Sequence, residues 1–274
     1  MSSSIDSTGS SGAPQLVQIA GLDLEVQVLG QIQPGAPALV FLHEGLGCVA
    51  LWRDFPARLV QRTGLPALLY SRRGYGRSQR FAQELQPGFM HEEARQVLPQ
   101  LLARFGIDRP VLIGHSDGAS IALIFAGEFA QRPLALVAMA PHLFVERITV
   151  DSIARIAQRF EQSDLPGRMA RYHDDARSTF GHWTRAWLSP AFETWNIEDP
   201  VARVRCPVLA LQGRSDEYGT LRQIHRIAEL APQVRLVELD NCGHSPFIDA
   251  PERVLDEIVA FLEKVAITPD DAAP

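Results

Sequence analysis

Cysteine is scarce in this sequence: 274 residues contain only Cys48, Cys206 and Cys242. They lie far apart and form no C-x-x-C pair, which argues against a zinc cage and against a disulfide framework. The odd number of cysteines is compatible with a reducing compartment, so a cytoplasmic location is expected.

Net positive charge and long apolar runs are also missing. There are 26 Lys and Arg residues against 32 Asp and Glu residues, a net charge of -6, and no long basic block. Such a chain lacks the electrostatic footprint of a nucleic-acid-binding protein, so no nucleic-acid partner is expected. No stretch of about 18 apolar residues is present, and no membrane partner is expected. The N-terminus has no basic region followed by an apolar run, so residues 1–14 are expected to be a flexible leader and not a signal peptide, and 266–274 a tail.

What the sequence does contain is an alternation of short apolar runs with helical patterns. The runs expected to be strands are 15–20, 22–30, 38–43, 66–71, 111–116, 134–140, 207–213 and 234–240. The segments with helical spacing are 50–64, 90–106, 117–131 and about 221–231 and 251–264. Because most runs are apolar throughout, the pattern predicts an α/β fold with a mostly parallel eight-stranded sheet and helices on both faces.

The alternation stops between residues 143 and 197. This segment is rich in Arg and aromatic residues, has helical patterns and shows no clear strand. We expect it to be a helical cap inserted into a core made of 15–142 and 198–265. The alternative is a set of extra packing helices with no role in binding.

A candidate nucleophile lies between the apolar run 111–116 and the helical stretch that follows. Gly114, Ser116 and Gly118 form the pattern G-x-S-x-G in a strand–turn–helix context. A serine on this sharp turn exposes its hydroxyl at the end of the sheet, and the glycines permit the tight turn and close strand–helix packing.

A base and an acid follow in the order that this chemistry uses. Asp216 and His244 each lie just after an apolar run, where parallel strands place functional residues. Serine needs a base to become a nucleophile, so we predict a Ser116–His244–Asp216 triad. We favour Asp216 over the adjacent Glu217 because the shorter side chain loses less rotamer freedom. Taken singly, each residue has a structural alternative: a turn histidine or a helix-capping aspartate.

These motifs resemble those of the α/β-hydrolase superfamily over about residues 15 to 265. Besides the serine, acid and histidine loops, LHEGLG (42–47) resembles the His-Gly loop and SRRGYGRS (71–78) the D-x-R-G-x-G-x-S loop. The resemblance implies a Ser-His-Asp triad, no cofactor, and hydrolysis of esters, thioesters or activated C–C bonds. By the same alignment, the backbone N–H groups of Gly45 and Asp117 are expected to form the oxyanion hole.

Two positions depart from the family pattern. Glu44 replaces the glycine after the histidine, and Ser71 replaces the usual aspartate. A carboxylate at position 44 would oppose an oxyanion unless it points away or is paired, and Arg72 and Arg73 are the nearest expected partners. A solvated Glu44 is the alternative.

Further residues are weighed for the pocket. His142, Trp183 and Trp187, with Glu44, are possible pocket residues, although turn and packing roles compete with this interpretation. The other histidines lack metal-ligand spacing, so no metal site is expected. Asp117 as an aspartate nucleophile is disfavoured because the glycines frame Ser116.

The sequence therefore predicts a serine hydrolase that cleaves a small-molecule carboxylic ester or thioester through an acyl-enzyme at Ser116. A C–C bond hydrolase or a perhydrolase on the same triad is the alternative among enzymes. A non-catalytic ligand-binding relative is the alternative outside them. The oligomeric state has no signal in the sequence.

Overall fold

The computed structural model describes residues 12–130 and 132–267. Most of the expected leader (1–14) and most of the expected tail (266–274) lie outside the described residues.

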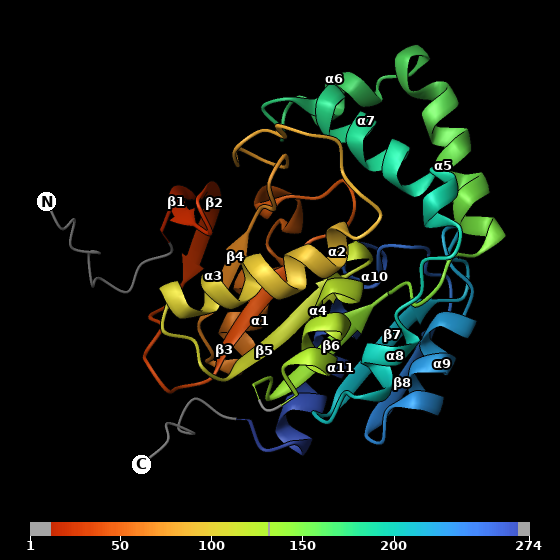
Figure 1. Ribbon diagram of the computed structural model, residues 1–274. Coiled ribbons are helices and arrows are strands. Elements are labelled where there is room, and N and C mark those ends of the chain that lie inside the picture. The colour runs from red at the N-terminus through yellow and green to blue at the C-terminus, as the bar shows by residue number, and fades with distance from the viewer. Residues whose placement is uncertain (1–11, 131, 268–274) are drawn as a thin grey trace, which may run out of the picture.

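One eight-stranded sheet organises the described chain (Figure 1). Its strand order is β1-β2-β4-β3-β5-β6-β7-β8; β2 runs antiparallel to both β1 and β4, and the remaining pairs are parallel. The predicted mostly parallel sheet is thus confirmed. The strands are β1 (Gln15–Ile19), β2 (Leu22–Leu29), β3 (Ala38–Leu42), β4 (Ala67–Tyr70), β5 (Pro110–His115), β6 (Ala135–Met139), β7 (Val208–Gly213) and β8 (Val234–Leu239).

Helices cover both faces because the strands are apolar on both sides. In β3, Val40 and Leu42 belong to one apolar cluster, whereas Leu39 and Phe41 belong to the other, as the two-residue period of a strand requires. The first cluster is covered by α2 (Phe89–Glu92), α3 (Leu98–Arg104), α4 (Asp117–Glu128), α8 (Glu198–Ala202) and α9 (Arg222–Leu230). The second is covered by α1 (Phe55–Thr63), α10 (Pro246–Asp249) and α11 (Pro251–Lys264).

Two of the predicted helices are interrupted. The segment 50–64 is a 3-10 turn, η1 (Val49–Trp52), followed by α1, with Arg53 between them at a φ of 55°. The segment 90–106 is divided into α2, a π-helical turn η2 (Glu93–Val97) and α3. Pro99 in the first turn of α3 has no N–H to donate, which disfavours a continuous α-helical ladder here.

A helical segment joins β6 to β7 and forms a separate layer beyond one end of the sheet (Figure 1). An isolated bridge between Phe144 and Asn196 brings its two ends together. Its own apolar cluster contains Phe160 and Phe180, whose rings stack. The segment consists of α5 (Arg147–Arg159), η3 (Phe160–Gln162), α6 (Leu165–Met169), α7 (Ala176–Trp187) and η4 (Pro190–Phe192).

Hydrogen bonds fasten this segment to loops at the carboxyl ends of the strands. Thr179 Oγ1 donates to the carbonyl of Gly74 at 2.6 Å, and His173 bridges the Gly76 N–H and the Leu46 carbonyl. The loops after β3 and β4 therefore lie directly under the inserted helices. Across residues 12–130 and 132–267, no helix has the length and apolar character needed to cross a membrane.

Candidate active site

Ser116 sits on a strained turn between β5 and α4. Its φ of 52° and ψ of -121° are rare for a residue with a side chain. A Cβ atom at Gly114 would meet Ala119 Cα at 2.5 Å, and one at Gly118 would meet the Leu42 carbonyl oxygen at 2.0 Å. Both glycines are therefore required for the close packing that holds the serine in this conformation.

The structure brings Ser116, His244 and Asp216 together in hydrogen-bond contact. His244 Nε2 lies 2.9 Å from Ser116 Oγ, and His244 Nδ1 lies 2.9 Å from Asp216 Oδ1. A carboxylate only accepts, so Nδ1 carries the proton and Nε2 is free to accept from the serine hydroxyl. This arrangement can remove a proton from Ser116 as its oxygen attacks.

Asp216 is held rigidly by donors on both oxygens. Oδ1 accepts from the N–H groups of Tyr218 (2.8 Å) and Gly219 (3.2 Å), and Oδ2 accepts from Gln212 Nε2 (3.0 Å). Burial by itself raises the pKa of Asp216, but the hydrogen bond and charge of His244 outweigh it and lower the pKa. Asp216 is therefore an ionised carboxylate that can stabilise the protonated form of His244.

The pKa of His244 shifts the opposite way. Burial lowers this pKa, but the hydrogen bond with Asp216 and the negative charges of Asp216, Glu217 and Glu44 raise it above 6.5. The alternative acid, Glu217, makes no hydrogen bond with His244; its Oε2 approaches Gly243 instead.

The two predicted oxyanion donors line the same cavity as Ser116. Asp117 is the first residue of α4, so its N–H has no partner within the helix. Gly45 lies in the loop after β3, and a Cβ there would meet Trp183 Nε1 at 2.2 Å. Trp183 Nε1 donates to Asp117 Oδ2 at 3.2 Å, which ties this carboxylate to α7 of the inserted segment.

Glu44 has a different partner from the one expected. The Arg72 guanidinium donates to the backbone carbonyl of Glu44 at 2.8 Å and pairs with Asp117 at 3.8 Å, and Arg73 Nε faces a backbone carbonyl. The Glu44 carboxylate instead lies 3.4 Å from His115 Nδ1. Its side chain is 24 % exposed, so a fully solvated Glu44 is also wrong.

Two residues near the site were missed in the sequence. His115 Nε2 lies 2.7 Å from the backbone carbonyl of His244 and so holds the histidine loop against β5. Glu25 in β2 places a carboxylate oxygen 2.7 Å from Ser71 Oγ. His115 could have been noticed as the residue preceding the serine, but nothing in its spacing indicates its partner.

A cavity of about 120 Å³ opens beside Ser116. His142, Trp183 and Trp187, the expected pocket residues, lie on its wall with Glu44. His142 Nδ1 and Trp187 Nε1 are buried without a hydrogen-bond partner among the described residues. Burial lowers the pKa of His142 to about 3, so this ring is neutral.

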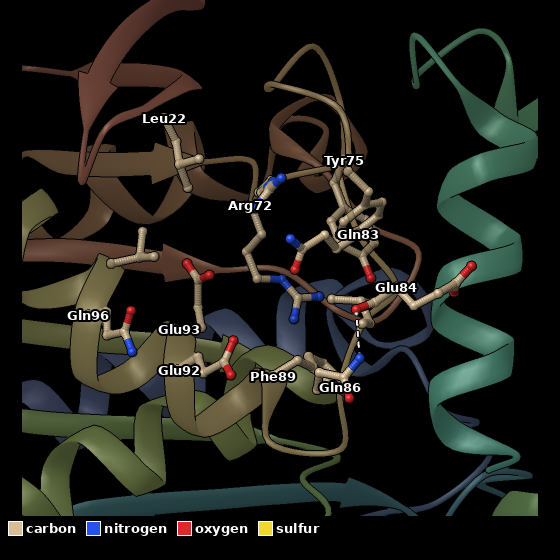
Figure 2. Close-up of a pocket in the computed structure, with 14 residues that line it drawn as sticks. Leu22, Arg72, Tyr75, Gln83, Glu84, Gln86, Phe89, Glu92, Glu93 and Gln96 are labelled. Atoms are coloured by element: carbon tan, nitrogen blue, oxygen red, sulfur yellow. Dashed lines mark hydrogen bonds between the residues drawn. The ribbon is translucent and has the colours of Figure 1, made fainter.

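Figure 2 shows a second cavity, of about 260 Å³, which is lined by Arg72. Arg72 extends into it from the loop after β4, and Glu93 points into it from η2. Burial raises the pKa of Glu93, against the charge of Arg72, and Glu93 accepts a hydrogen bond from Tyr70. Since Arg72 also pairs with Asp117, this ion pair separates the two cavities.

In the part of the chain that the structure describes, no group of three or more His, Cys, Asp and Glu side chains is arranged to hold a metal ion. The three cysteines are buried and unpaired.

Comparison with known proteins decides the family. Residues 39–257 match the sequence profile of the alpha/beta hydrolase family. The chain belongs to this family. It is 24% identical over 261 residues to the sn-1-specific diacylglycerol lipase of Mus musculus, covering 82% of this chain and 81% of the lipase.

Two further relatives illustrate the breadth of this family. The 2-hydroxy-6-oxononadienedioate/2-hydroxy-6-oxononatrienedioate hydrolase of Comamonas testosteroni is 20% identical over 243 residues, 76% of this chain and 81% of that protein. Among solved structures, the enol-lactonase of Burkholderia xenovorans superposes with a TM-score of 0.72 at 18% identity, over 90% of this chain and 99% of the lactonase. These similarities support a hydrolase and leave its bond type open.

Proposed function

We propose that this alpha/beta hydrolase is a serine hydrolase that cleaves a small carboxylic ester or thioester. The observation that carries the proposal is the continuous hydrogen-bonded path from Ser116 through His244 to Asp216, with 2.9 Å at each step. The complete path also argues against the ligand-binding alternative, because a protein that only binds its ligand does not require a base stabilised by a carboxylate.

In the proposed reaction, His244 takes the Ser116 proton as the serine oxygen attacks the acyl carbonyl. The N–H groups of Gly45 and Asp117 stabilise the tetrahedral oxyanion. His244 then donates the proton to the leaving group, and a water activated by His244 releases the acid. The cavity of about 120 Å³ beside Ser116 would hold the acyl group, and we call it the acyl cavity. The helices between β6 and β7 act as its cap, because Trp183 and Trp187 of α7 form part of its wall. A cytoplasmic location stays a prediction.

The alternative on the same triad is C–C bond hydrolysis. It is favoured by the Comamonas testosteroni relative, whose named substrates contain hydroxy, oxo and carboxylate groups and no ester. Comparing a short ester, its thioester and a 6-oxo-dienoate under one set of conditions separates the two functions. A perhydrolase activity would appear only when peroxide is added.

A fluorophosphonate probe tests the nucleophile. We expect the probe to label the wild-type protein and not the Ser116→Ala variant, whose kcat falls by roughly 10³-fold or more. Ser116→Ala removes one oxygen from a residue that is 5 % exposed, so its melting temperature should be unchanged. Labelling of the variant, with a tenth of the activity retained, would place the nucleophile elsewhere.

A further inference from the structure

The acyl cavity has a carboxylate, Glu44, in its wall. Its apolar lining includes Leu46 and Ile153, and its volume of about 120 Å³ favours a short acyl group. The other carboxylate that lines it, Asp117, is neutralised by Arg72 and bonded to Trp183. Glu44 is thus the carboxylate in this wall that can accept a hydrogen bond from the acyl group of a substrate.

The contact with His115 favours the ionised form of Glu44. His115 Nε2 faces a carbonyl oxygen of His244, so it must carry a proton. His115 Nδ1 then faces Glu44 Oε2 across 3.4 Å, and a proton on one of the two is needed to make this contact favourable. Burial raises the pKa of Glu44, but the hydrogen bond and charge of His115 outweigh it and lower the pKa to about 2.

One Glu44 oxygen remains available to a substrate. Oε2 is turned toward His115, and the carboxylate also has a backbone hydrogen bond within its own residue, whereas Oε1 makes no hydrogen bond with any other residue in 12–130 or 132–267. His142, which lines the same cavity, is neutral and offers no positive charge to a substrate. An acyl group with a carboxylate would therefore meet repulsion, and one with an N–H donor would find an acceptor.

We propose that Glu44 makes this cavity select short acyl groups that carry an ammonium or other N–H donor, and reject acyl groups that carry a carboxylate. The proposal rests on the serine hydrolase function proposed above and specifies its substrate class. Such a donor also offsets the repulsion that Glu44 exerts on the developing oxyanion.

Three ethyl esters that differ only in the group at the end of the acyl chain test this selection: ethyl β-alaninate (ammonium), ethyl butyrate (methyl) and monoethyl succinate (carboxylate), compared near neutral pH. In the wild type, we expect kcat/KM for β-alaninate to exceed that for butyrate by about tenfold or more. In Glu44→Gln this preference should disappear, and the succinate/butyrate ratio should rise about tenfold. The amide of Gln can still donate to His115 Nδ1, and Glu44→Ala serves as a second variant should Gln alter folding.

Glu217→Gln is the matched control. Both Glu44 and Glu217 raise the pKa of His244, but only Glu44 lines the cavity. Both variants should shift the pH profile downward, whereas only Glu44→Gln should change the ranking of the esters. Unchanged ranking in both Glu44 variants, or equal changes in Glu217→Gln, overturns the selection proposal.

Binding separates this proposal from the proposed function. In Ser116→Ala, tryptophan fluorescence reports binding of the same three esters, because Trp183 and Trp187 line the cavity. If the wild type hydrolyses none of the esters, the ester hydrolase function fails, and the binding ranking with and without Glu44→Gln still decides the selection. Tighter binding of β-alaninate that depends on Glu44 supports it, and equal binding of all three refutes it.

Discussion

Replacing Asp216 by Asn removes a charge while keeping the shape of the side chain. The Oδ1 position is surrounded by three donors, the N–H groups of Tyr218 and Gly219 and Nδ1 of His244, whereas Oδ2 faces one, Gln212. The amide oxygen should therefore occupy the Oδ1 position and keep the His244 Nδ1–H bond. Gln212 Oε1 has no partner among the described residues and can accept from the new NH₂ group if the Gln212 amide rotates, which breaks the Nε2 hydrogen bond to the Gly219 carbonyl.

The activity lost in Asp216→Asn is consequently due to the missing negative charge, because the tautomer of His244 is kept. A charge about 4 Å from the imidazolium at an effective dielectric constant of about 20 contributes up to about 4 kcal/mol, and a charge-assisted hydrogen bond is about twice as strong as a neutral one. We expect about 2–4 kcal/mol, or roughly 30- to 1000-fold in kcat/KM.

The assay is kcat/KM for one short ester across pH, with Glu217→Gln measured alongside. The pH midpoint of Asp216→Asn should fall, because the hydrogen bond and charge that raise the pKa of His244 are lost. Glu217→Gln should lose less than about tenfold, as expected for a peripheral charge. A loss of about 10⁴-fold in Asp216→Asn would refute the reasoning, since it would show the NH₂ group facing His244 in the wrong tautomer.

Three other predictions concern the same site. In the wild type, kcat/KM should rise with pH as His244 loses its proton, with a midpoint above 6.5; a rate that is flat between about pH 5 and 8 would exclude His244 as the base. Trp183→Phe, which removes the hydrogen bond to Asp117, should cost about 1.5–3 kcal/mol in the free energy of unfolding. Trp187 Nε1 has no hydrogen-bond partner in the described chain, so Trp187→Phe should lower the free energy of unfolding less and mainly change the acyl preference. Denaturant unfolding and an ester panel compare the two variants. Equal losses of stability would contradict these different roles of the two tryptophans. EDTA should leave activity unchanged, because the triad needs no metal; loss with EDTA and recovery with zinc would contradict it.

The sequence predicted the sheet because the strands are apolar on both faces, and a run such as 111–116 has no other stable environment. It also indicated which residues lie together, because Ser116, Asp216 and His244 each follow a strand. The geometry of the loops could not be predicted from the sequence in this way. Glu44 and His115 are separated by 71 residues, and their contact depends on how the loop after β3 bends toward the end of β5.

The predictions that failed also concern the geometry of loops and of the backbone. Arg72 binds the backbone of Glu44 and not its carboxylate, because Asp117 is the closest carboxylate to its guanidinium. The interruption of the helix at Arg53 and the π-helical turn before Pro99 are backbone adjustments that leave the apolar spacing intact. Hydrophobic periodicity therefore cannot reveal them.

The strand order has a consequence for how the protein acquires its activity. Ser116 follows β5, whereas Asp216 and His244 follow β7 and β8, and β6 lies between them in the sheet. Parallel pairing of these strands requires long crossovers, which form slowly relative to local helices. During refolding, helical circular dichroism should recover before hydrolase activity. A chain emerging from the ribosome would carry Ser116 on its finished elbow long before any base is available, so hydrolysis begins only when β8 and the His244 loop have docked.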